Sequence, residues 1–555
     1  MKIDDISQGA AALDRLRRAA ASARQIQEAQ LRAILRQNAK TAYGARWGFS
    51  RIRSLADFQE RVPLSRYPDY EPYVQALLAG DTRQLTAEEP VYFAITSGST
   101  GVPKYVPVTA ADMAVHRDLI HWGVWGMVEE HFPQTPPEAL FGRIFQVGEF
   151  AKTRLPGGQL CGIRSASLYQ WLDREGGFDA SPYCVPKEVL FPERVEDLTY
   201  VKVRFALAER RLTAIHSVFL HRVVSVLDYI RQNWELLLRD IAAGTVDESV
   251  PLESPWREKL RRWLPPDPRR AAELRALRVD RQAENMVGRI WPELRYIVGI
   301  GGASFPVYTR AMERYAPGLP IHHFIYGASE GFLSIAAGVG VPDAYLLLPE
   351  AGFFEFLPVP GETGAPRTMG QVEAGRRYEL VFTNHSGLYR YRMGDVLEVV
   401  GFLAQAPVVR FCYRRGQALN VADEKLSLEQ LRAAMERFQA GAGLSAAFCA
   451  QEDLSRRPGR YLFYLEHPPL RHAEVLLDRC LGEASLGYRS CRAMGDIAPP
   501  RVRFLPPGSF QRYEAALARR GRAMAQYKPV EVLRREEERR FFTAEADEYE
   551  GRGEL

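Results

Sequence analysis

The sequence has few cysteines and lacks any long apolar run. Its six cysteines, in a chain of 555 residues, form no C-x-x-C pair and have no histidine nearby at metal-ligand spacing. We therefore expect free thiols in a reducing compartment, which excludes a disulfide scaffold. The N-terminal segment carries charge throughout and lacks the apolar core of a signal peptide, and no later stretch reaches the roughly 18 apolar residues of a membrane helix. These absences predict a cytoplasmic protein with no membrane partner.

An excess of charge of one sign is also missing. The chain has 73 basic and 68 acidic residues, a net charge of +5, and no basic run is flanked by aromatic residues. We therefore predict no nucleic-acid partner. Lysine is scarce, because only nine of the 73 basic residues are lysines. A lysine at a motif position is therefore informative, since a compact ammonium does not replace a planar guanidinium at a phosphate oxygen.

Helical and β-type segments alternate along the chain. Long helical stretches, such as 212–241, are followed by short apolar runs that end in small residues, such as 294–302. This alternation predicts an α/β fold. A polar stretch at 420–424 separates a strand from a helix that begins near Ser427, so we place a domain boundary there. The prediction is a large N-terminal domain of several subdomains, residues 1–424, and a small α/β domain, residues 425–555, with a frayed acidic tail from 545.

A loop rich in glycine and hydroxyl groups lies between two β-type runs. It reads TSGSTGVPK over 96–104, and Thr109 then caps a helical stretch that reaches about Glu130. Backbone N–H groups, hydroxyls and an ammonium in such a loop suit phosphate oxygens. The loop is not a Walker A motif, because Lys104 begins a strand rather than a helix. A plain hairpin turn is as compatible with this loop, taken alone, as a phosphate site is.

Two strand ends with small residues follow, VGIGGASFP around Gly301 and FIYGASEGF around Tyr326. Adjacent strand ends form the floor of a cleft in α/β proteins. The second segment also carries Ser329 and Glu330, and a carboxylate there suits a Mg²⁺ ion that bridges to phosphates. Taken alone, Glu330 would more often be an ordinary surface acid.

The segment GLYRYRMGD places Arg390, Arg392 and Asp395 around a glycine. A carboxylate at a strand end has the acceptor capacity for both hydroxyls of a ribose. A turn-capping aspartate is the alternative. Arg414 and Arg415 follow on the next predicted strand, where either could reach a ribose or a phosphate.

Taken in order, these segments resemble the acyl-adenylate-forming superfamily and, more closely, the acyl acid amido synthetases first known as plant auxin-responsive proteins. The resemblance spans nearly the whole chain and includes the flanks FQERVPLSRYPDYEPYVQALLAGD, YELVFTNHSGLYRYRMGDVLEVVGF and AQYKPVEV. Plant members usually write the loop as Ser-Ser-Gly-Thr-Ser-Gly and the later motif as Ser-Ser-Glu. TSGSTG and GASEG are closer to the general adenylating pattern.

The resemblance implies an ATP- and Mg²⁺-dependent ligase that joins a small carboxylic acid to AMP and passes the acyl group to an amino acid or another amine. It implies that residues 1–424 form an adenylating domain, which binds the nucleotide and the acyl acid, and that residues 425–555 form a mobile domain. It also implies Lys528 and Lys104 as catalytic lysines and Glu330 as the metal ligand. The nucleotide-site residues that it implies are Ser97, Gly98, Ser99, Thr100, Gly302, Tyr326, Ser329, Glu330, Asp395, Arg414 and Lys425. Within this set, Gly302 and Tyr326 would line the adenine slot, Asp395 would hold the ribose, and Lys425 would lie at the hinge.

Two other functions fit parts of the sequence. An AMP-forming acyl-CoA ligase would use the same motifs but a thiol acceptor, and a non-catalytic nucleotide-binding scaffold would need only some of them. Retention of Lys104, Glu330, Asp395 and Lys528 together argues against the scaffold. Trp122 and Trp125, on the helix after the loop, fit an acyl pocket or, more commonly at helical spacing, a core. The acyl acid, the acceptor and the oligomeric state are not assigned by the sequence.

Overall fold

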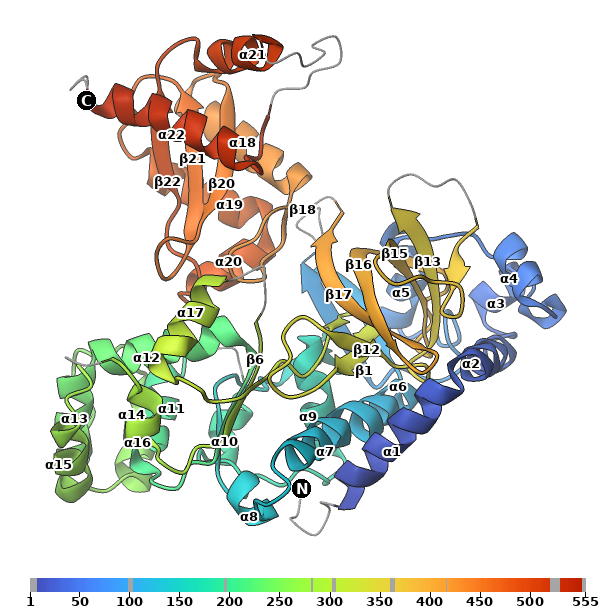
Figure 1. Ribbon diagram of the computed structural model, residues 1–555, viewed down its shortest axis with the longest axis horizontal. Helices are drawn as coiled ribbons and strands as arrows, with labels where there is room; N and C mark the ends of the chain where they lie inside the picture. The colour runs from blue at the N-terminus through green and yellow to red at the C-terminus, as the bar shows by residue number, and fades with distance from the viewer. Residues whose placement is uncertain are drawn as a thin grey trace. The chain divides into compact units, whose positions relative to one another are not determined.

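The chain divides into two units, Met1–Thr96 with Lys104–Arg415, and a smaller one of Gly416–Leu555 to which Ser97–Pro103 is also assigned (Figure 1). This structure is a computed structural model and describes residues 7–97, 103–193, 197–280, 283–301, 306–359, 365–415, 417–519 and 530–551. Both units contain helices and strands, which confirms the predicted α/β class with a large N-terminal and a smaller C-terminal domain. The division lies between 415 and 416, so the boundary placed at 424/425 falls inside the smaller unit.

A seven-stranded antiparallel sheet carries several of the candidate residues. Its strand order is β11-β12-β17-β16-β15-β13-β14. The strands are β11 (Ser334–Ala336), β12 (Tyr345–Leu347), β13 (Phe353–Val359), β14 (Arg367–Thr368), β15 (Arg377–Thr383), β16 (Tyr391–Leu403) and β17 (Ala406–Arg414). The pairing of β16 with β17 sets Asp395 directly opposite Arg414. Two motifs that are separate in the sequence are thereby brought together.

Helices near the N-terminus pack against this sheet. In α2 the residues Leu31, Ile34 and Leu35 are buried, at the spacing of one apolar helix face, and α2 contacts β13. The helices of this region are α1 (Ser7–Ala21), α2 (Ala23–Gln37), α3 (Ala42–Arg46), α4 (Leu55–Arg61) and α5 (Tyr67–Leu78), with the short 3₁₀ turn η2 (Phe49–Arg51).

A second sheet contains four parallel strands in the order β3-β6-β7-β8. They are β3 (Ile144–Gln146), β6 (Ala214–Phe219), β7 (Tyr296–Ile300) and β8 (Ile321–His322). Side chains alternate between its faces, so Ile215 and Ile297 enter one core while Ala214 and Tyr296 enter another. Helix α12 packs on β6 and β7. The helices of this region are α11 (Thr199–Ala208), α12 (Leu220–Gln232), α13 (Trp234–Ala243), α14 (Ser254–Trp263), α15 (Pro268–Ala276), α16 (Met286–Ile290) and α17 (Pro306–Tyr315).

The two strands and the helical stretch predicted within 92–130 are present, and the loop residues 98–102 between the strands lie outside the described ranges. Strands β1 (Tyr92–Ser97) and β2 (Pro103–Val108) belong to a sheet of order β2-β1-β5-β4, with β4 (Thr153–Arg154) and β5 (Leu160–Gly162). The Thr109 side chain accepts a hydrogen bond from the Asp112 N–H, which confirms the predicted cap. The helical stretch is α6 (Ala110–Val115), the π-helical segment η3 (His116–His121) and α7 (Trp122–His131), and it is followed by α8 (Pro137–Leu140), α9 (Arg164–Arg174) and α10 (Lys187–Leu190).

The smaller unit is built on three strands in the order β20-β21-β22. Its elements are β18 (Gln417–Leu419), β19 (Leu426–Ser427), α18 (Leu428–Ala442), β20 (Phe448–Asp453), β21 (Arg460–Glu466), α19 (Ala473–Ala484), α20 (Leu486–Ala493), β22 (Arg501–Leu505), α21 (Ser509–Arg519) and α22 (Glu536–Gly551). Ser427 caps α18 in a capping box with Gln430. Of the helices in the described ranges, none has the length and apolar character of a bilayer span.

The frayed tail expected from 545 is wrong, because α22 continues to Gly551. Ala546 is fully buried, and Asp547 and Glu550 accept hydrogen bonds from Arg503 at 2.7 Å each. Acidic residues that look like a solvated tail in the sequence therefore bind an arginine of β22.

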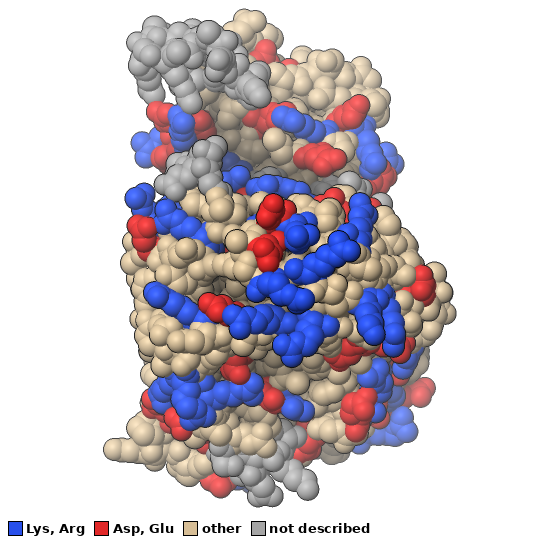
Figure 2. Space-filling view, turned by 90° about the vertical axis from the view of Figure 1, so that its right-hand side faces the viewer, with Lys and Arg blue, Asp and Glu red and all other residues tan. Residues whose placement is uncertain are grey.

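One face of the molecule is rich in basic side chains. Figure 2 shows Lys and Arg side chains gathered across the middle of one face, with few Asp or Glu side chains among them. Such a face gives a positive local potential that attracts anions, although the net charge is small. All six cysteines are free, as predicted.

Candidate nucleotide-binding site

Asp395 lies at the centre of a buried cluster in the larger unit. Arg414, opposite it on β17, donates from Nε to Oδ1 at 2.5 Å and from its terminal nitrogen to Oδ2 at 3.0 Å. Tyr326, which follows β8, donates its hydroxyl to Oδ2 at 2.8 Å. The side chain of Asp395 is only 4% exposed. Three residues predicted for one site, from three separate motifs, are therefore in direct contact.

The charges of this cluster favour the observed donors. Burial raises the pKa of Tyr326, and the Asp395 carboxylate raises it further, so the hydroxyl keeps its proton. Burial alone would lower the pKa of Arg414, but the Asp395 carboxylate outweighs that effect and the pKa is raised. Tyr326 and the Arg414 guanidinium therefore remain donors to Asp395 at any ordinary pH.

The acceptor capacity of Asp395 is largely used. A carboxylate offers about four lone-pair positions. Arg414 takes two of them and Tyr326 takes a third. As the side chains stand, Asp395 can accept a hydrogen bond from one incoming hydroxyl, so the predicted pair of bonds to a ribose requires Arg414 or Tyr326 to release one position.

Glu330 lies in a tight hairpin beside this cluster. Strands β9 (Gly327–Ala328) and β10 (Gly331–Phe332) pair with Ala328 opposite Gly331, so Ser329 and Glu330 form the turn. The Glu330 carbonyl accepts a hydrogen bond from Asn384 at 2.8 Å, and the residue is 9% exposed. Burial raises the pKa of Tyr391, and the hydrogen-bonded Glu330 carboxylate raises it further. Glu330 is therefore a buried, held carboxylate and not the ordinary surface acid of the alternative interpretation.

Lys104 approaches the cluster from β2. Its Nζ lies 5.3 Å from the ring centroid of Tyr67, and Tyr67 in turn adds to the raised pKa of Tyr391. Lys104 contacts Tyr67, whereas Glu330 is hydrogen-bonded to Tyr391, so the two predicted residues have different tyrosine neighbours. Sequence reasoning missed Tyr391, although it lies only four positions before Asp395, at the start of the same strand, β16.

Several predicted residues lie outside the described ranges or in the smaller unit. Gly98, Ser99, Thr100, Gly302 and Lys528 fall outside the described residues, and Ser97 ends β1 with no described side chain. Lys425 belongs to the smaller unit, where its Nζ pairs with Asp423 at 2.9 Å. The roles given to these residues stay predictions.

The segment expected to be a hinge is fixed within the smaller unit. The Glu424 carboxylate accepts hydrogen bonds from the N–H groups of Val421 and Ala422, both at 2.6 Å, and from the Tyr461 hydroxyl. The Lys425 N–H donates to the Asn420 side chain at 3.0 Å. A pivot inside 420–425 would have to break these bonds.

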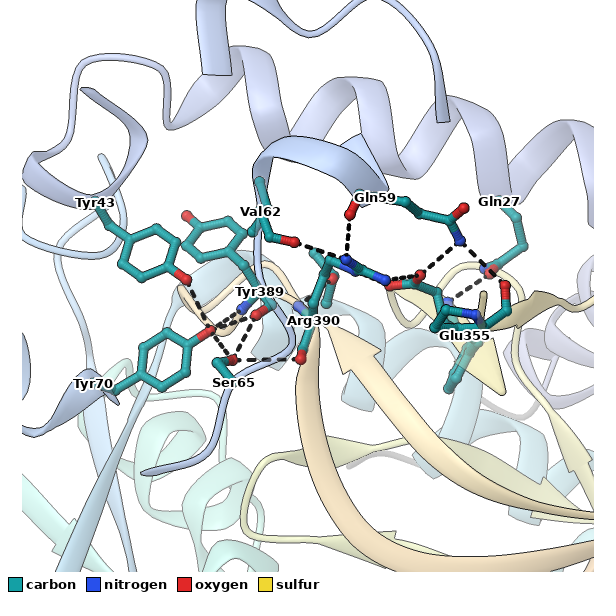
Figure 3. Close-up of polar contacts among 12 residues, drawn as sticks. Gln27, Tyr43, Gln59, Val62, Ser65, Tyr70, Glu355, Tyr389 and Arg390 are labelled. Carbon is teal, nitrogen blue, oxygen red and sulfur yellow. Dashed lines mark hydrogen bonds and ion pairs between the residues drawn. The ribbon is translucent and has the colours of Figure 1, made fainter. Parts of the chain in front are cut away.

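Arg390 is a core residue rather than part of the site. It forms a bidentate pair with Glu355 at 2.9 and 3.0 Å and donates to the carbonyls of Gln59 and Val62 at 2.8 and 2.7 Å (Figure 3). The two charged side chains are 4% and 1% exposed. Figure 3 shows each guanidinium nitrogen of Arg390 hydrogen-bonded to an oxygen of the protein. This arginine therefore stabilises the fold.

The fold is shared with solved structures of amido synthetases and of a related ligase. The chain matches the GH3.15 acyl acid amido synthetase with a TM-score of 0.65 at 24% identity, covering 96% of each chain. It matches 2-hydroxyisobutyryl-CoA ligase, in complex with 2-HIB-AMP and CoA, with a TM-score of 0.51 at 14% identity, covering 96% of this chain and 93% of that one. The chain therefore has the fold of these two enzymes.

The family follows from the sequence models. The GH3 family N-terminal domain matches residues 12–321, the central domain 345–414 and the C-terminal domain 429–537. The chain belongs to the GH3 family, which confirms the resemblance to acyl acid amido synthetases. Asp395 and Arg414 lie in the central domain, whereas Tyr326 and Glu330 lie between two matched segments.

Curated relatives agree with this assignment. Jasmonoyl–L-amino acid synthetase JAR6 of Nicotiana attenuata is 29% identical over 527 residues, which cover 91% of this chain and 90% of the relative. Indole-3-acetic acid-amido synthetase GH3.8 of Oryza sativa subsp. indica is 29% identical over 537 residues, covering 91% and 87%. At the level of the family, the chain is therefore an amide-forming ligase, as predicted.

Proposed function

We propose that this protein is an ATP- and Mg²⁺-dependent acyl acid amido synthetase that couples a small carboxylic acid to an amino acid or another amine. The observation that carries the proposal is the contact of Tyr326, Asp395 and Arg414 beside a buried Glu330, in a chain that belongs to the GH3 family. The names of the relatives support an acyl acid as one substrate and an amino acid as the acceptor.

The first half-reaction forms an acyl-adenylate. A carboxylate oxygen of the acid attacks the α-phosphorus of ATP, the bond to the β-phosphate oxygen breaks, and pyrophosphate leaves. Asp395 holds the ribose through its free acceptor position, and Arg414 offers charge near the sugar and phosphate. Lys104 and Lys528 supply ammonium groups that offset the charge developing on the phosphates.

The second half-reaction forms the amide. The amine nitrogen attacks the acyl carbon, the bond from that carbon to the AMP oxygen breaks, and AMP leaves while the nitrogen gives a proton to solvent. Because pyrophosphate has already left at this stage, the phosphate charge that Lys528 would offset is smaller. We therefore infer that the approach of Lys528 belongs to the first half-reaction alone.

The residues present fit a magnesium ion. Mg²⁺ in proteins commonly uses one or two carboxylates together with substrate phosphates and waters. Glu330 is one such carboxylate, held by its turn and by Tyr391. Among the described residues, no group of three or more His, Cys, Asp or Glu side chains forms a self-sufficient metal cage. Bound there, Mg²⁺ would neutralise phosphate charge during adenylation.

The location that we propose is the cytoplasm. The six free cysteines support a reducing compartment.

Pyrophosphate exchange tests the proposal. The purified chain, incubated with ATP, Mg²⁺, labelled pyrophosphate and a panel of carboxylic acids, should incorporate label into ATP with at least one acid. The Glu330→Gln variant should lose about a hundredfold or more of this exchange, because it loses the carboxylate at the metal. Glu28→Gln is the matched control, since Glu28 is an exposed acid of α2 paired with Arg32. No exchange with any acid, or full exchange in Glu330→Gln, would refute the assigned site.

The acceptor is tested on the same preparation. With an activated acid, we expect a product whose mass includes an amino acid and no thioester with coenzyme A. A coenzyme A thioester in place of the amide would support the alternative acyl-CoA ligase.

A further inference from the structure

A row of mostly polar side chains crosses the parallel sheet, level with Gln146 and His322, the last residues of β3 and β8. Gln146, His216, Val298 and His322 are register neighbours on β3, β6, β7 and β8, so all four share one face. Tyr296, two residues before Val298 on β7, lies on the same face. Figure 1 shows β6 between the helices α11 to α16 and the part of the unit that contains α7 and α9.

The histidines of this row have unused hydrogen-bonding atoms. His322 is fully buried, yet neither of its ring nitrogens has a hydrogen-bond partner among the described residues. The buried Nε2 of His216 and the Tyr296 hydroxyl also have none within the described ranges. Leaving a buried polar group unpaired costs about 1 to 3 kcal/mol, so four such atoms on one face require an explanation.

These groups are uncharged. Burial lowers the pKa of His216 and of His322 to about 3, so both rings are neutral near physiological pH. Burial raises the pKa of Tyr296, so its hydroxyl stays protonated. A neutral imidazole has one N–H donor and one acceptor nitrogen. The row therefore offers donors and acceptors together, which suits an uncharged polar group rather than an ion.

The row is close to the nucleotide site along the chain. Tyr326, which contacts Asp395, follows His322 by four residues, a span of at most about 14 Å in extended chain. The Gly301 N–H, just after β7, donates to His323 Nδ1 at 3.1 Å, so the ends of β7 and β8 are joined at this edge. Ligands of parallel sheets bind at the carboxyl ends of the strands.

His121, on η3, lies near His216 of this row. The charge of His121 adds to the lowered pKa of His216, and the His121 ring lies 6.2 Å from that of Tyr169 on α9. His216, His121 and Tyr169 are only partly buried, so solvent reaches this face of the sheet. Trp125 instead stacks on Phe141 at 4.1 Å and is 9% exposed, which fits the core role that was the alternative for it.

We propose that His216, Tyr296 and His322 bind an uncharged polar group, such as a hydroxyl or a ring N–H, at the end of the acyl acid far from its carboxylate. The inference rests on the proposed function, because it places the reacting carboxylate at the nucleotide. A purely hydrocarbon acid would leave these buried atoms unpaired, and sites built for a substrate hydroxyl reject the analogue that lacks it far more strongly than apolar sites reject a missing methylene.

Matched acids test the inference. The pairs are para-hydroxyphenylacetate with phenylacetate, and para-hydroxyphenylpropionate with phenylpropionate, which place one hydroxyl at two distances from the carboxylate. Calorimetry gives the binding of each acid, and pyrophosphate exchange gives its activation. The wild type should favour the hydroxylated member of at least one pair by about tenfold or more in both measurements.

Variants of the row test whether its histidines cause the preference for the hydroxylated acid. His322→Leu, which keeps the bulk and removes both nitrogens, should reduce the preference by about tenfold and improve binding of the member without the hydroxyl. His322→Gln, which restores a donor and an acceptor, should recover part of it. His216→Leu is the second variant should His322→Leu fail to fold, and His467→Leu in the smaller unit is the control that should keep the wild-type preference.

Three results would overturn the inference. They are equal binding of both members of each pair by the wild type, binding of neither member, and an unchanged preference in both leucine variants, which would leave buried water as the partner of these atoms. Absence of exchange with every acid, while calorimetry still shows the preference and its loss in the variants, would instead refute the proposed function and leave the polar recognition standing.

Discussion

The pH dependence of the smaller unit should be set in part by Glu424. The residue is 2% exposed, and burial raises the pKa of its carboxyl group to about 7 although the bonds from Tyr461, Ala422 and Val421 lower it. In the unfolded chain the carboxyl group has its ordinary pKa of 4.5. Between these two values the folded state holds one proton that the unfolded state has lost, so stability falls as the pH rises.

The size of this effect follows from the shift. Each pKa unit corresponds to about 1.4 kcal/mol, so a shift from 4.5 to about 7 corresponds to about 3 kcal/mol. Stability of the smaller unit should therefore be greatest below about pH 4.5, fall by about 1.4 kcal/mol per pH unit up to about pH 7, and stay level above it, as far as this one group is concerned. The total free energy of unfolding of a domain is only about 5 to 15 kcal/mol, so this decrease in stability is measurable.

Hydrogen exchange in the full chain measures the pH-dependent stability of the smaller unit locally. Amides of β20 and β21 report opening of the smaller unit, once exchange times are corrected for the intrinsic effect of pH. Glu424→Gln carries no titrating group, so the difference in opening free energy between wild type and variant isolates Glu424. Glu436→Gln is the matched control, because Glu436 is an exposed acid of α18 in the same unit.

Two results would refute this reasoning. One is a pH slope in Glu424→Gln equal to that of the wild type. The other is a wild-type stability that rises relative to the variant across the same range, which would mean that the three donors outweigh burial and hold the carboxylate ionised.

The remaining predictions concern the larger unit and Lys528. Asp395→Asn should weaken ATP binding by about tenfold in calorimetry, because the amide keeps one acceptor oxygen and loses the charge-assisted bonds; unchanged affinity would remove Asp395 from the site. Glu355→Gln should lower the free energy of unfolding by about 3 to 5 kcal/mol in denaturant titrations, since it leaves the buried Arg390 charge uncompensated, and a loss below about 1 kcal/mol would contradict that interpretation. Lys528→Ala should depress pyrophosphate release by about a hundredfold or more while ATP affinity is nearly kept, and unaltered release would end its catalytic assignment.

Local signals in the sequence predicted the local structure well. The strands at 92–97 and 103–108, the cap at Thr109 and the start of α18 after Ser427 all depend on residues within a few positions of one another. The tail from 545 failed for the opposite reason, because its partners lie on β22 and α21, more than 30 residues away. A charged helix that packs on a distant sheet has the same composition as a solvated tail.

In the candidate site, too, local motifs were predicted and contacts between distant residues were not. Glu330 and Asp395 were found because each lies in a short motif next to glycine. The hydrogen bond from the Tyr326 hydroxyl to Asp395 was not foreseen, since the two residues are 69 positions apart and meet only in the folded chain. That bond changes the expectation for the ribose, because it uses an acceptor position that the sequence left open.

The four arginines near the GLYRYRMGD segment look alike in the sequence, and their carboxylate partners separate them. Arg390 pairs with Glu355 inside the core, whereas Arg392 and Arg415 share Glu379, whose side chain is 1% exposed.

Arg414 differs from the other three because its partner is shared with Tyr326 and its guanidinium adds to the environment of Glu330 and Tyr391. An arginine–carboxylate pair that serves only the fold can in principle be replaced by a well-packed apolar pair. The carboxylate partner of Arg414 instead keeps one acceptor position next to a second buried acid, which leaves it able to bind a ligand. By that criterion we assign Arg414, alone among these four, to the proposed nucleotide site.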